Sequence, residues 1–472
     1  MSTVLVYGYF RSVHVGHFRL FEFAKSLGSG LVVGIHMSDG NDVEFSEAMI
    51  RAIPFVDDAF TYSTLETLLS KVKPDLVVRG FEHKYKLDED NQLLNSKGIK
   101  VLYGSGNYQL SAIEYVTLNH GNIHIRNAFR EYAHHYSIKK SDVEAITSEL
   151  RNARVKIVGD LIIDEYVNCQ PLGMSQEDHI VVHSPLSHTK FLGGAAIVAA
   201  HCKSLGATVE FITLVGNDDN AKWAIEQLSS LGIEKVLSID DVRPTVLKQR
   251  YTTSKQTLFR LNHFRSKPAD VGVELSIVRN VTHNLNSYNA LIFSDFSYGC
   301  LSENVVSEIM KIAKNHKSLI SVADSQSSSQ LGALRKFQGI DILSATEFEV
   351  RSELRNEVDG VAVLTEKISR EMGGAAVILK VGVDGLLYLE SKEHNKSYVP
   401  QEVPASTVSA VDPSGAGDSL LAVSTLARAV GADLKLATFI GSIAAGIQVS
   451  RRGNIPITPE EISRAIKEVY QI

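Results

Sequence analysis

The sequence predicts an α/β protein of two domains: an N-terminal Rossmann-like domain and a larger α/β domain. Three observations support this prediction. Short apolar runs alternate with segments of helical periodicity near the N-terminus, and the alternation restarts on a larger scale from Val155. A polar segment separates the two regions. Finally, 472 residues are too many for one ordinary hydrophobic core.

The bulk composition limits the function classes. Hydrophobic residues make up 44% and charged residues 22% of the chain, as in globular proteins. The net charge of −6 gives no basis for binding nucleic acid or an acidic membrane surface. The three cysteines lack metal-ligand spacing, no secretion signal is present, and the apolar segment Ala437–Val449 is too short to span a bilayer. We therefore expect a cytoplasmic protein without nucleic-acid or membrane partners.

Four buried parallel strands are expected in the first domain, with an apolar helix between the first two. They are the segments Val4–Val6, Leu31–Ile35, Leu76–Val78 and Lys100–Leu102. Such alternation implies a doubly wound sheet that binds ligands at the carboxyl ends of its strands. The first strand-to-helix turn contains His14, Gly16 and His17. Two imidazoles at a helix N-terminus can both donate hydrogen bonds to phosphate oxygens.

The stretch GYFRSVHVGHFRLFEFAKSLG resembles the cytidylyltransferase-like nucleotidyltransferases, whose pattern is G-x-F-D-x-x-H-x-G-H. The stretches LVVGIHMSD and PDLVVRGFEHK extend the likeness. In that family the histidines stabilise the triphosphate of a nucleotide that a sugar phosphate attacks. The resemblance implies catalytic roles for His14 and His17, and nucleotide-binding roles for Gly8, Phe10, Gly16, Asp39 and Arg79.

Three departures from this pattern leave the activity of the first domain open. Arg11 stands where the pattern has Asp, and no lysine occurs between Lys25 and Lys71, where the family has a phosphate-binding lysine. The late Ser/Thr-rich motif is reduced to QLSAI. Arg11 or Arg51 could replace the lost cation, although Arg and Lys differ in geometry. Catalysis and nucleotide binding without catalysis both remain open.

A polar connector follows the first domain. We place the nucleotidyltransferase-like domain at residues 1–125, a linker with helices at 126–152, and the second domain at 153–472. In the linker, Ser141 and Glu144 have the spacing of a capping box that opens a helix.

The stretch Ala410–Val423, AVDPSGAGDSLLAV, is the feature around which the second domain is organised. Gly415, Ala416 and Gly417 are small enough for close backbone approach at the start of a helix. There, unpaired N–H groups and the helix dipole favour a phosphate. Asp418 follows, and a carboxylate beside a phosphate site suits a base that takes a proton from an attacking hydroxyl.

DPSGAGD resembles the C-terminal signature of the ribokinase-like (PfkB) carbohydrate kinases, and FLGGAAIVAAHCKSLGA resembles their N-terminal signature. The resemblance implies ATP as a substrate, Mg²⁺ as a cofactor, Asp418 as catalytic base and an anion hole at Gly415, Ala416 and Gly417. It implies sugar-binding roles for Asp160, Gly193, Gly194 and Asp295. It implies nucleotide-binding roles for Lys380, Gly382, Gly385 and Asp412, and a role for Glu349 in organising hydrated Mg²⁺. Without the resemblance, Asp160 is equally a turn cap.

Two polar, β-prone stretches, Val167–His183 and Thr245–Asn262, fall outside the strand–helix rhythm. In ribokinase-like enzymes, strands at these positions form a lid over the sugar and often pair with another subunit. The resemblance therefore implies a lid that excludes water as a competing phosphoryl acceptor. It also implies a homodimer formed through the lid strands.

The two halves together resemble the family of bifunctional heptose-7-phosphate kinases/heptose-1-phosphate adenylyltransferases, with the domain order reversed. Within the kinase half, Ile197 and Thr346 each replace an Asn and Tyr298 replaces a Lys. The sequence Asp324-Ser325-Gln326 stands where the family has D-P-K. These losses at sugar- and phosphate-facing positions argue for a different or less phosphorylated sugar.

We therefore expect an ATP-dependent sugar or sugar-phosphate kinase fused to a nucleotidyltransferase-like domain. Together they would make an activated nucleotide sugar of the heptose type, with a second nucleoside triphosphate as a further substrate. Two alternatives remain open. One is an active sugar kinase with a catalytically degenerate N-terminal nucleotide-binding domain, and the other is a non-catalytic sugar- or nucleotide-binding regulator.

Overall fold

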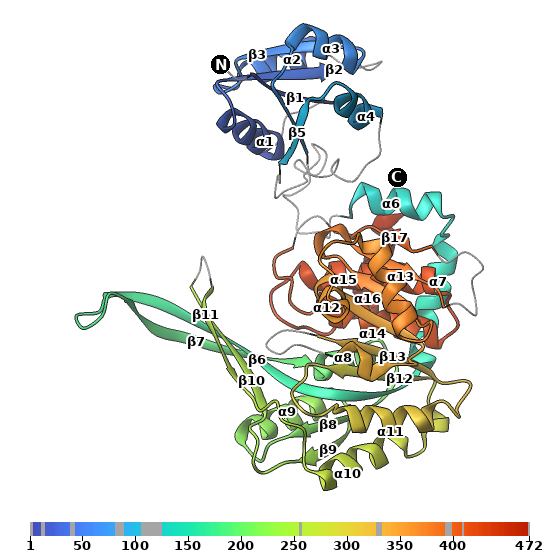
Figure 1. Ribbon diagram of the computed structural model, residues 1–472. Helices are drawn as coiled ribbons and strands as arrows, with labels where there is room; N and C mark the ends of the chain where they lie inside the picture. Colours follow the sequence, from blue (N-terminus) through green and yellow to red (C-terminus); the bar gives the residue numbers. More distant parts are fainter. Residues whose placement is uncertain are drawn as a thin grey trace. The chain divides into compact units, whose positions relative to one another are not determined.

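The computed structural model describes residues 3–10, 15–37, 43–80, 89–104, 125–253, 257–326, 333–391, 399–407 and 410–470. The chain forms two compact units, Met1–His124 and Ile125–Ile472 (Figure 1). Each unit has its own sheet and its own hydrophobic core.

The N-terminal unit is a parallel sheet with helices on both faces. Its strand order is β3-β2-β1-β4-β5. The elements are β1 (Thr3–Gly8), α1 (Val15–Ser26), β2 (Gly30–His36), α2 (Val43–Arg51), β3 (Asp58–Tyr62), α3 (Leu65–Val72), β4 (Leu76–Gly80), α4 (Glu89–Ser96) and β5 (Lys100–Gly104). Along β1, Val4 and Val6 belong to one core and Leu5 to the other, so the strand is buried on both sides. The four predicted strands are confirmed, and β3, whose sequence DAFTY mixes polar and apolar residues, was not predicted.

The segment predicted to be a linker belongs to the second unit. It forms α6 (Asn127–His135) and α7 (Lys140–Glu149). The ring of Phe129 stacks on that of Phe439 at a centroid distance of 4.5 Å, which anchors α6 to the core. The predicted capping box at Ser141 is wrong. Because α7 begins at Lys140, Ser141 lies inside its first turn, and the N-cap residue makes no side-chain hydrogen bond.

The second unit is built on a large sheet through which β6 (Arg154–Met174) runs. Its first residues, 154–160, pair in parallel with β8 and β12. The main sheet has the order β9-β8-β6-β12-β13-β14-β15-β16-β17, and only its last two strands are antiparallel to their neighbours. These strands are β8 (Thr208–Val215), β9 (Glu234–Ile239), β12 (Ala290–Asp295), β13 (Ile320–Ser325), β14 (Ile342–Thr346), β15 (Ala376–Lys380), β16 (Leu386–Leu389) and β17 (Gln401–Val403).

Helices cover both faces of this main sheet (Figure 1). One face packs against α10 (Val271–Thr282), α11 (Glu303–Ala313), α12 (Glu347–Leu354) and α13 (Val361–Glu371). The other packs against α8 (Ala195–Ser204) and α14 (Ala416–Ala429), with α15 (Leu434–Val449) and α16 (Pro459–Val469) beyond, while α9 (Asp219–Ser230) follows β8. The apolar segment at 437–449 lies in α15 and is mostly buried, as predicted. Among the described residues, no helix is both long enough and apolar enough to cross a membrane.

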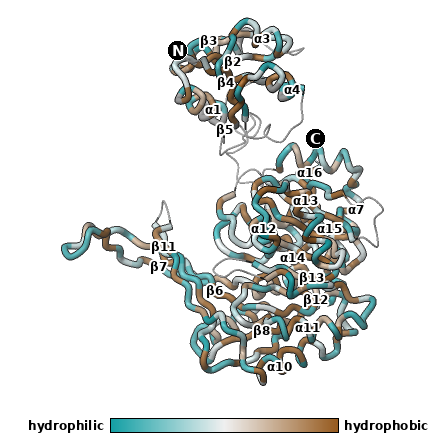
Figure 2. Tube along the Cα trace, viewed as in Figure 1, coloured by the Kyte–Doolittle hydropathy of each residue, from teal (hydrophilic) through white to brown (hydrophobic). Residues whose placement is uncertain are grey.

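A second, smaller sheet projects from the unit as an arm. From residue 161 onward, β6 leaves the main sheet and pairs with β7 (Val181–Gly194) and with β10 (Val246–Thr252), which in turn pairs with β11 (Thr257–His263). We call these four segments the arm sheet (Figure 1). The arm strands include residues 167–174 and 181–183 of the first β-prone stretch and 246–252 and 257–262 of the second. Hydrophobic residues are interspersed with hydrophilic ones along the arm (Figure 2).

Candidate active site

The N-terminus of α14 requires glycine on two grounds. Gly415, its N-cap, has φ +79°, in the left-handed region that favours glycine. A Cβ at this position would lie 2.5 Å from Asn454 Oδ1. Ala416 and Gly417 then begin the helix, so the backbone N–H groups of this turn lie at the positive end of the helix dipole. This arrangement fits the anion hole expected from the sequence.

Asp418 lies in the first turn of α14 and is 6% exposed. Its Oδ1 accepts a hydrogen bond of 3.0 Å from Gln326 Nε2. Burial and the charge of Asp324 raise the pKa of Asp418 to about 7, against the opposing charge of Lys380. A carboxylate with a pKa near neutrality is well matched to general-base catalysis, because it is ionised yet still basic.

A buried ion pair lies next to Asp418. The ammonium of Lys380, at the end of β15, contacts both carboxylate oxygens of Asp324 on β13 at 2.8 Å. The Lys380 Nζ also lies 3.3 Å from the position that a Cβ of Gly417 would take. Burial raises the pKa of Asp324 to about 6, with Lys380 lowering and Glu349 raising it. Lys380 is therefore beside the expected anion hole, as its predicted nucleotide-binding role requires.

Asp164 is a site residue that the sequence did not single out. Its Oδ2 accepts a 3.0 Å hydrogen bond from Asn454 Nδ2, and its Oδ1 lies 3.3 Å from a guanidinium nitrogen of Arg250. The negative charge of Asp164 also contributes to the raised pKa of Asp418, after burial and the charge of Asp324. Gly193 is packed against Asp164, because a Cβ there would lie 2.3 Å from its Oδ2. The only sequence signal was the second Asp in GDLIID, four residues after Asp160.

The carboxylates of Asp160 and Asp295 are occupied by protein groups. Asp160 accepts hydrogen bonds from the backbone N–H groups of the loop after β12, at Phe296, Tyr298 and Cys300. Asp295 accepts from Ser325 Oγ and pairs with Lys336, both at 2.7 Å. Asp160 therefore supports the loop at 296–300, and Asp295 does so by also accepting a 3.1 Å hydrogen bond from Ser297 N. A sugar hydroxyl would have to share or displace them, so their sugar-binding roles stay predictions.

Asp412 precedes α14, and Gly194 is the N-cap of α8. Asp412 accepts hydrogen bonds from Tyr166 Oη at 2.8 Å and Ser414 N at 3.0 Å. Burial works against ionisation, but these bonds lower the pKa of Asp412 below its usual value. Gly194 has φ +58° and caps α8, where a Cβ would lie 2.5 Å from the Asp160 carbonyl oxygen.

The predicted nucleotide-binding glycines follow Lys380. Gly382 begins a 3-10 turn, Gly382–Asp384, which Gly385 ends with φ +105°. A Cβ on Gly385 would lie 2.2 Å from the Val403 carbonyl oxygen. The turn thus needs glycine to bend the chain from β15 back into β16.

Glu349 caps the N-terminus of α12, a role that the sequence did not predict. Thr346, the N-cap of α12, and Glu349 form a capping box, in which Thr346 N donates to Glu349 Oε2 at 2.7 Å. The charge of Glu349 still acts on Asp324 and Lys380. In the described parts of the chain, no three His, Cys, Asp or Glu residues are grouped as a metal cage. The negative charges of Asp324, Glu349 and Asp418 around one ammonium nevertheless suit a cation that keeps its own waters.

In the N-terminal unit, several predicted site residues are described. His17 lies in α1, with its ring 5.0 Å from that of Phe10, which is buried. Arg79, at the end of β4, is 5% exposed, lies over the Tyr7 ring at 5.3 Å and is 3.7 Å from Asp90. Gly8 ends β1, and Gly16 is in the first turn of α1.

The other expectations for this unit divide into two groups. His14, Arg11, Asp39 and the QLSAI stretch lie outside the described residues. Arg51, considered as a substitute cation, is held by protein groups. Its guanidinium pairs with Glu47 at 2.9 Å and with Asp58 at 2.5 Å, and it donates to the Ala59 carbonyl.

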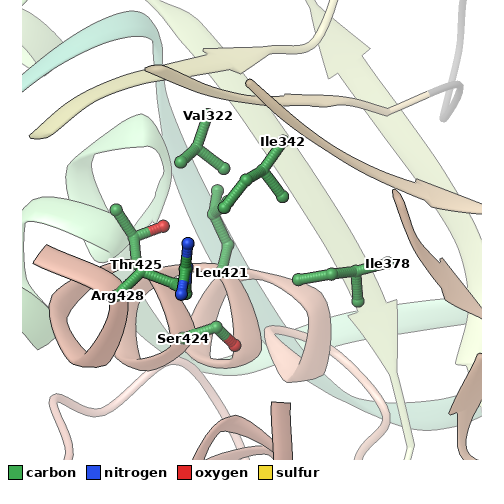
Figure 3. A pocket seen from close by; sticks show the side chains of 7 residues that line it. All are labelled: Val322, Ile342, Ile378, Leu421, Ser424, Thr425 and Arg428. Atoms are coloured by element: carbon green, nitrogen blue, oxygen red, sulfur yellow. The ribbon is translucent and has the colours of Figure 1, made fainter. Parts of the chain in front are cut away.

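A small cavity lies between α14 and strands β13 to β15, away from the N-terminus of the helix (Figure 3). Its volume of ≈ 10 Å³ has room for about one water molecule. It is lined by Val322, Ile342, Ile378, Leu421, Ser424, Thr425 and Arg428. This cavity is too small for a sugar or a nucleotide.

Comparison with known proteins identifies the class. The model of the pfkB family of carbohydrate kinases matches residues 152–461. The chain therefore belongs to the pfkB family of carbohydrate kinases.

Named relatives and solved structures agree with this assignment. The chain is 27% identical over 333 residues to the bifunctional protein HldE of Pelobacter propionicus, covering 69% of this chain and 66% of the relative. The chain is 24% identical to the bifunctional protein HldE of Geobacter metallireducens, over 69% of this chain and 65% of the relative. The chain thus spans about two thirds of the length of these relatives.

Two solved structures show the ribokinase-like fold of the second unit. A ribokinase from Thermotoga maritima superposes with a TM-score of 0.52 at 22% identity, over 67% of this chain and 99% of its own. Phosphofructokinase-2 from Escherichia coli superposes with a TM-score of 0.54 at 13% identity, over 68% of this chain and 99% of its own.

Proposed function

We propose that the second unit is an ATP-dependent kinase that phosphorylates a hydroxyl group of a sugar or sugar phosphate. The observation that carries this proposal is the position of Asp418. It is a buried carboxylate with a pKa raised to about 7, one residue beyond the glycine-bearing turn at 415–417. A base and an anion-binding turn in such proximity are the two protein elements that phosphoryl transfer to an alcohol requires.

In the proposed mechanism, Asp418 accepts the proton of the attacking hydroxyl. The sugar oxygen forms a bond to the γ-phosphorus while the bond from that phosphorus to the β,γ-bridging oxygen breaks, which releases ADP. The N–H groups of Gly415, Ala416 and Gly417 stabilise the charge on the transferring group. Gln326 holds the carboxylate of Asp418 in place. Mg²⁺, held through water near Glu349, would supply charge neutralisation for the phosphates.

The acceptor is proposed to contact Asp164 rather than to depend on Asp160 alone. Asp164 and Asn454 are buried and hydrogen-bonded to each other, Arg250 pairs with Asp164, and the charge of Asp164 acts on Asp418. The Asp164 carboxylate and the Asn454 amide oxygen are both acceptors of the kind that bind the hydroxyl groups of a sugar. The likeness to proteins named HldE supports a heptose-type acceptor, while Tyr298 and Gln326 in place of lysines support one with altered phosphorylation.

The N-terminal unit is proposed to be a nucleotidyltransferase-like domain that precedes the kinase. The parallel five-stranded sheet, His17 at the first helix and the buried Arg79 support nucleotide binding. If both units are active, the pair makes a nucleotide sugar. The ion pairs that hold Arg51 favour the alternative, in which this unit binds a nucleotide without transferring it, because they leave only Arg11 of the two substitute cations considered.

The arm sheet is proposed to act as a lid over the sugar and to join two copies of the chain. Support comes from large hydrophobic side chains that are exposed near its tip. They include Leu172, Met174, Ile180 and Leu186, with exposed fractions between 58% and 63%. Such a cluster is costly to leave in water, and a second arm would cover it.

The proposal is tested by a screen of sugars and sugar phosphates for ADP release, with the wild type and Asp418→Asn run in parallel. We expect at least one acceptor to stimulate ADP release by the wild type and not by the variant. Binding of ATP and a sugar without turnover under any condition would favour the non-catalytic regulator. Equal turnover by the variant would show that another group is the base.

A further inference from the structure

The Lys380–Asp324 pair has one accessible member. Asp324 is fully enclosed, with a side-chain exposure of 0%, whereas that of Lys380 is 11%. Both Asp324 oxygens are directed at the same ammonium. An ammonium has three N–H donors on a flexible stem, so Lys380 can turn toward a new acceptor, whereas the carboxylate cannot follow.

A group bound in the expected anion hole would be the nearest new hydrogen-bond acceptor for Lys380. The Lys380 Nζ lies 3.3 Å, and its Cδ 3.7 Å, from the position of a Cβ on Gly417. Glycine at 417 therefore leaves the space through which the lysine reaches the start of α14. A phosphate bound at the N–H groups of this turn would lie beside the ammonium.

The charges around Lys380 favour a change of partner from Asp324 to a bound phosphate. Although burial opposes it, the charges of Asp324, Glu349 and Asp418 raise the pKa of Lys380, so the ammonium stays protonated. A triphosphate adds further negative charge next to these three carboxylates. Phosphate oxygens and Asp324 would then compete for the same cation.

On the basis of the proposed kinase function, we propose that Asp324 is a positioning residue that holds Lys380 in the absence of ATP. When ATP binds, the Lys380 ammonium leaves Asp324 and contacts the phosphates. Lys380 then supplies the positive charge that Gln326, which stands in the place of a lysine in the D-P-K sequence, does not supply. Asp324 thereby lowers the apparent affinity for ATP, because the lysine must leave it before it can bind phosphate.

The test measures MgATP binding at the kinase site of the full-length chain. Hydrogen exchange of the peptide that spans Ala410–Val423 is followed as MgATP is added, because this readout is local to the turn and needs no sugar. The variants are Asp324→Asn, Lys380→Met and the two combined. Lys336→Met is the matched control, since Lys336 forms a comparable buried pair with Asp295.

We expect Lys380→Met to raise the MgATP concentration for half-maximal protection by about 10- to 100-fold, the scale of one hydrogen bond to a charged group. Asp324→Asn is expected to lower it about 3- to 10-fold, because the lysine is no longer held. The double variant should behave like Lys380→Met, since Asp324 acts only through the lysine. Lys336→Met should lose thermal stability and leave the half-maximal concentration unchanged.

Several outcomes would overturn the inference. If Asp324→Asn weakened MgATP binding as strongly as Lys380→Met does, Asp324 would have a merely structural role. Equal effects of Lys336→Met and Lys380→Met would show that loss of any buried pair accounts for the result. MgATP binding by the wild type with no effect of Lys380→Met would overturn the inference and leave the proposed kinase intact. A complete absence of protection in the wild type would overturn the proposed kinase function and this inference with it.

Discussion

Arg126 donates a hydrogen bond of 2.8 Å from its guanidinium to the carbonyl oxygen of Val383. Arg126 is the second residue of the kinase unit, and Val383 lies in the turn that carries two of the predicted nucleotide-binding glycines. A second bond, from Arg126 N to the Ser406 carbonyl, holds the same residue to the segment that follows β17. The start of the kinase unit therefore supports its expected ATP-binding turn.

We predict that Arg126→Ala raises the KM for ATP about 2- to 10-fold with little change in kcat. The loss of one net hydrogen bond loosens the turn without touching the reacting groups. Steady-state kinetics with ATP varied would measure it, and Lys140→Ala on α7, whose ion pair with Glu144 is exposed, is the control. A drop in kcat with an unchanged KM would contradict this account of Arg126.

The pH dependence of the kinase should report Asp418. Since its pKa is raised to about 7 and only the ionised form accepts a proton, kcat/KM is expected to rise with pH and level off above that value. Because the charge of Asp324 helps to raise this pKa, Asp324→Asn should move the rise to lower pH. Asp418→Asn should reduce kcat about 10²- to 10⁴-fold and abolish the rise. A profile that is flat between pH 5 and 8 in the wild type would contradict the assignment.

His201 should make the kinase unit sensitive to acid. It is completely buried on α8, where its Nδ1 accepts a hydrogen bond from Ile457 N, and burial lowers its pKa to about 3. The unfolded chain binds a proton at this position below about pH 6.5, but the folded chain does not. The stabilisation is therefore fully present above pH 6.5 and is lost as the pH falls toward 3, by up to about 1.4 kcal/mol per pH unit.

The measurement is the free energy of unfolding in denaturant at pH 7, 6 and 5 for the wild type and His201→Gln. The variant should be less stable at pH 7, yet its stability should fall less steeply with acid. His134→Gln, at an exposed position on α6, should follow the wild type. Identical slopes for His201→Gln and the wild type would show that His201 is not the residue that titrates on unfolding.

The exposed apolar tip of the arm predicts self-association. We expect the full-length chain to be a dimer by light scattering, and Leu172→Lys combined with Ile180→Lys to be a monomer with an unchanged circular dichroism spectrum. Placing charges in an apolar interface is strongly unfavourable. Val358→Lys, at a position 93% exposed near the end of α12, should remain dimeric. A wild type that is monomeric at all concentrations would rule out the proposed role of the arm in assembly.

For the N-terminal unit, we predict that Arg51→Ala leaves pyrophosphate release from ATP and a sugar 1-phosphate unchanged. The guanidinium pairs with Glu47 and Asp58 and donates to the Ala59 carbonyl, so a phosphate would have to displace these partners. His17→Ala should reduce any such release about 10-fold or more, as expected for loss of a hydrogen bond to charged phosphate. A strong loss in Arg51→Ala with a normal unfolding temperature would show that Arg51 leaves these partners when the nucleotide binds.

Much of the fold could be predicted because its signals are local. The apolar runs identified four of the five parallel strands of the N-terminal unit. DPSGAGD placed a glycine turn directly before a helix, as found at Gly415 and α14. Strand β3 was missed because its mixed composition lacks a clear period, and the start of α7 was misjudged by the choice of Ser141 as its cap.

The site was harder to predict because its residues come from distant parts of the chain. Asp164 and Asn454 are 290 positions apart in sequence, and no short motif links them. A carboxylate at the end of a strand, such as Asp160, looks the same in the sequence whether it faces a ligand or the backbone of a neighbouring loop. Only the fold shows that the N–H groups at 296–300 turn back onto it.

The continuity of β6 would connect the proposed assembly through the arm with the proposed active site. One strand belongs to the main sheet up to residue 160 and to the arm from residue 161, so the arm has no separate hinge segment within it. Asp164 lies just past this junction, whereas Asp418 is on a helix packed against the main sheet. Bending of β6 between residues 160 and 164 would therefore change the separation of the two carboxylates. A second copy that clamps the arm would thus alter affinity for the acceptor, and the acceptor would reciprocally strengthen or weaken the dimer.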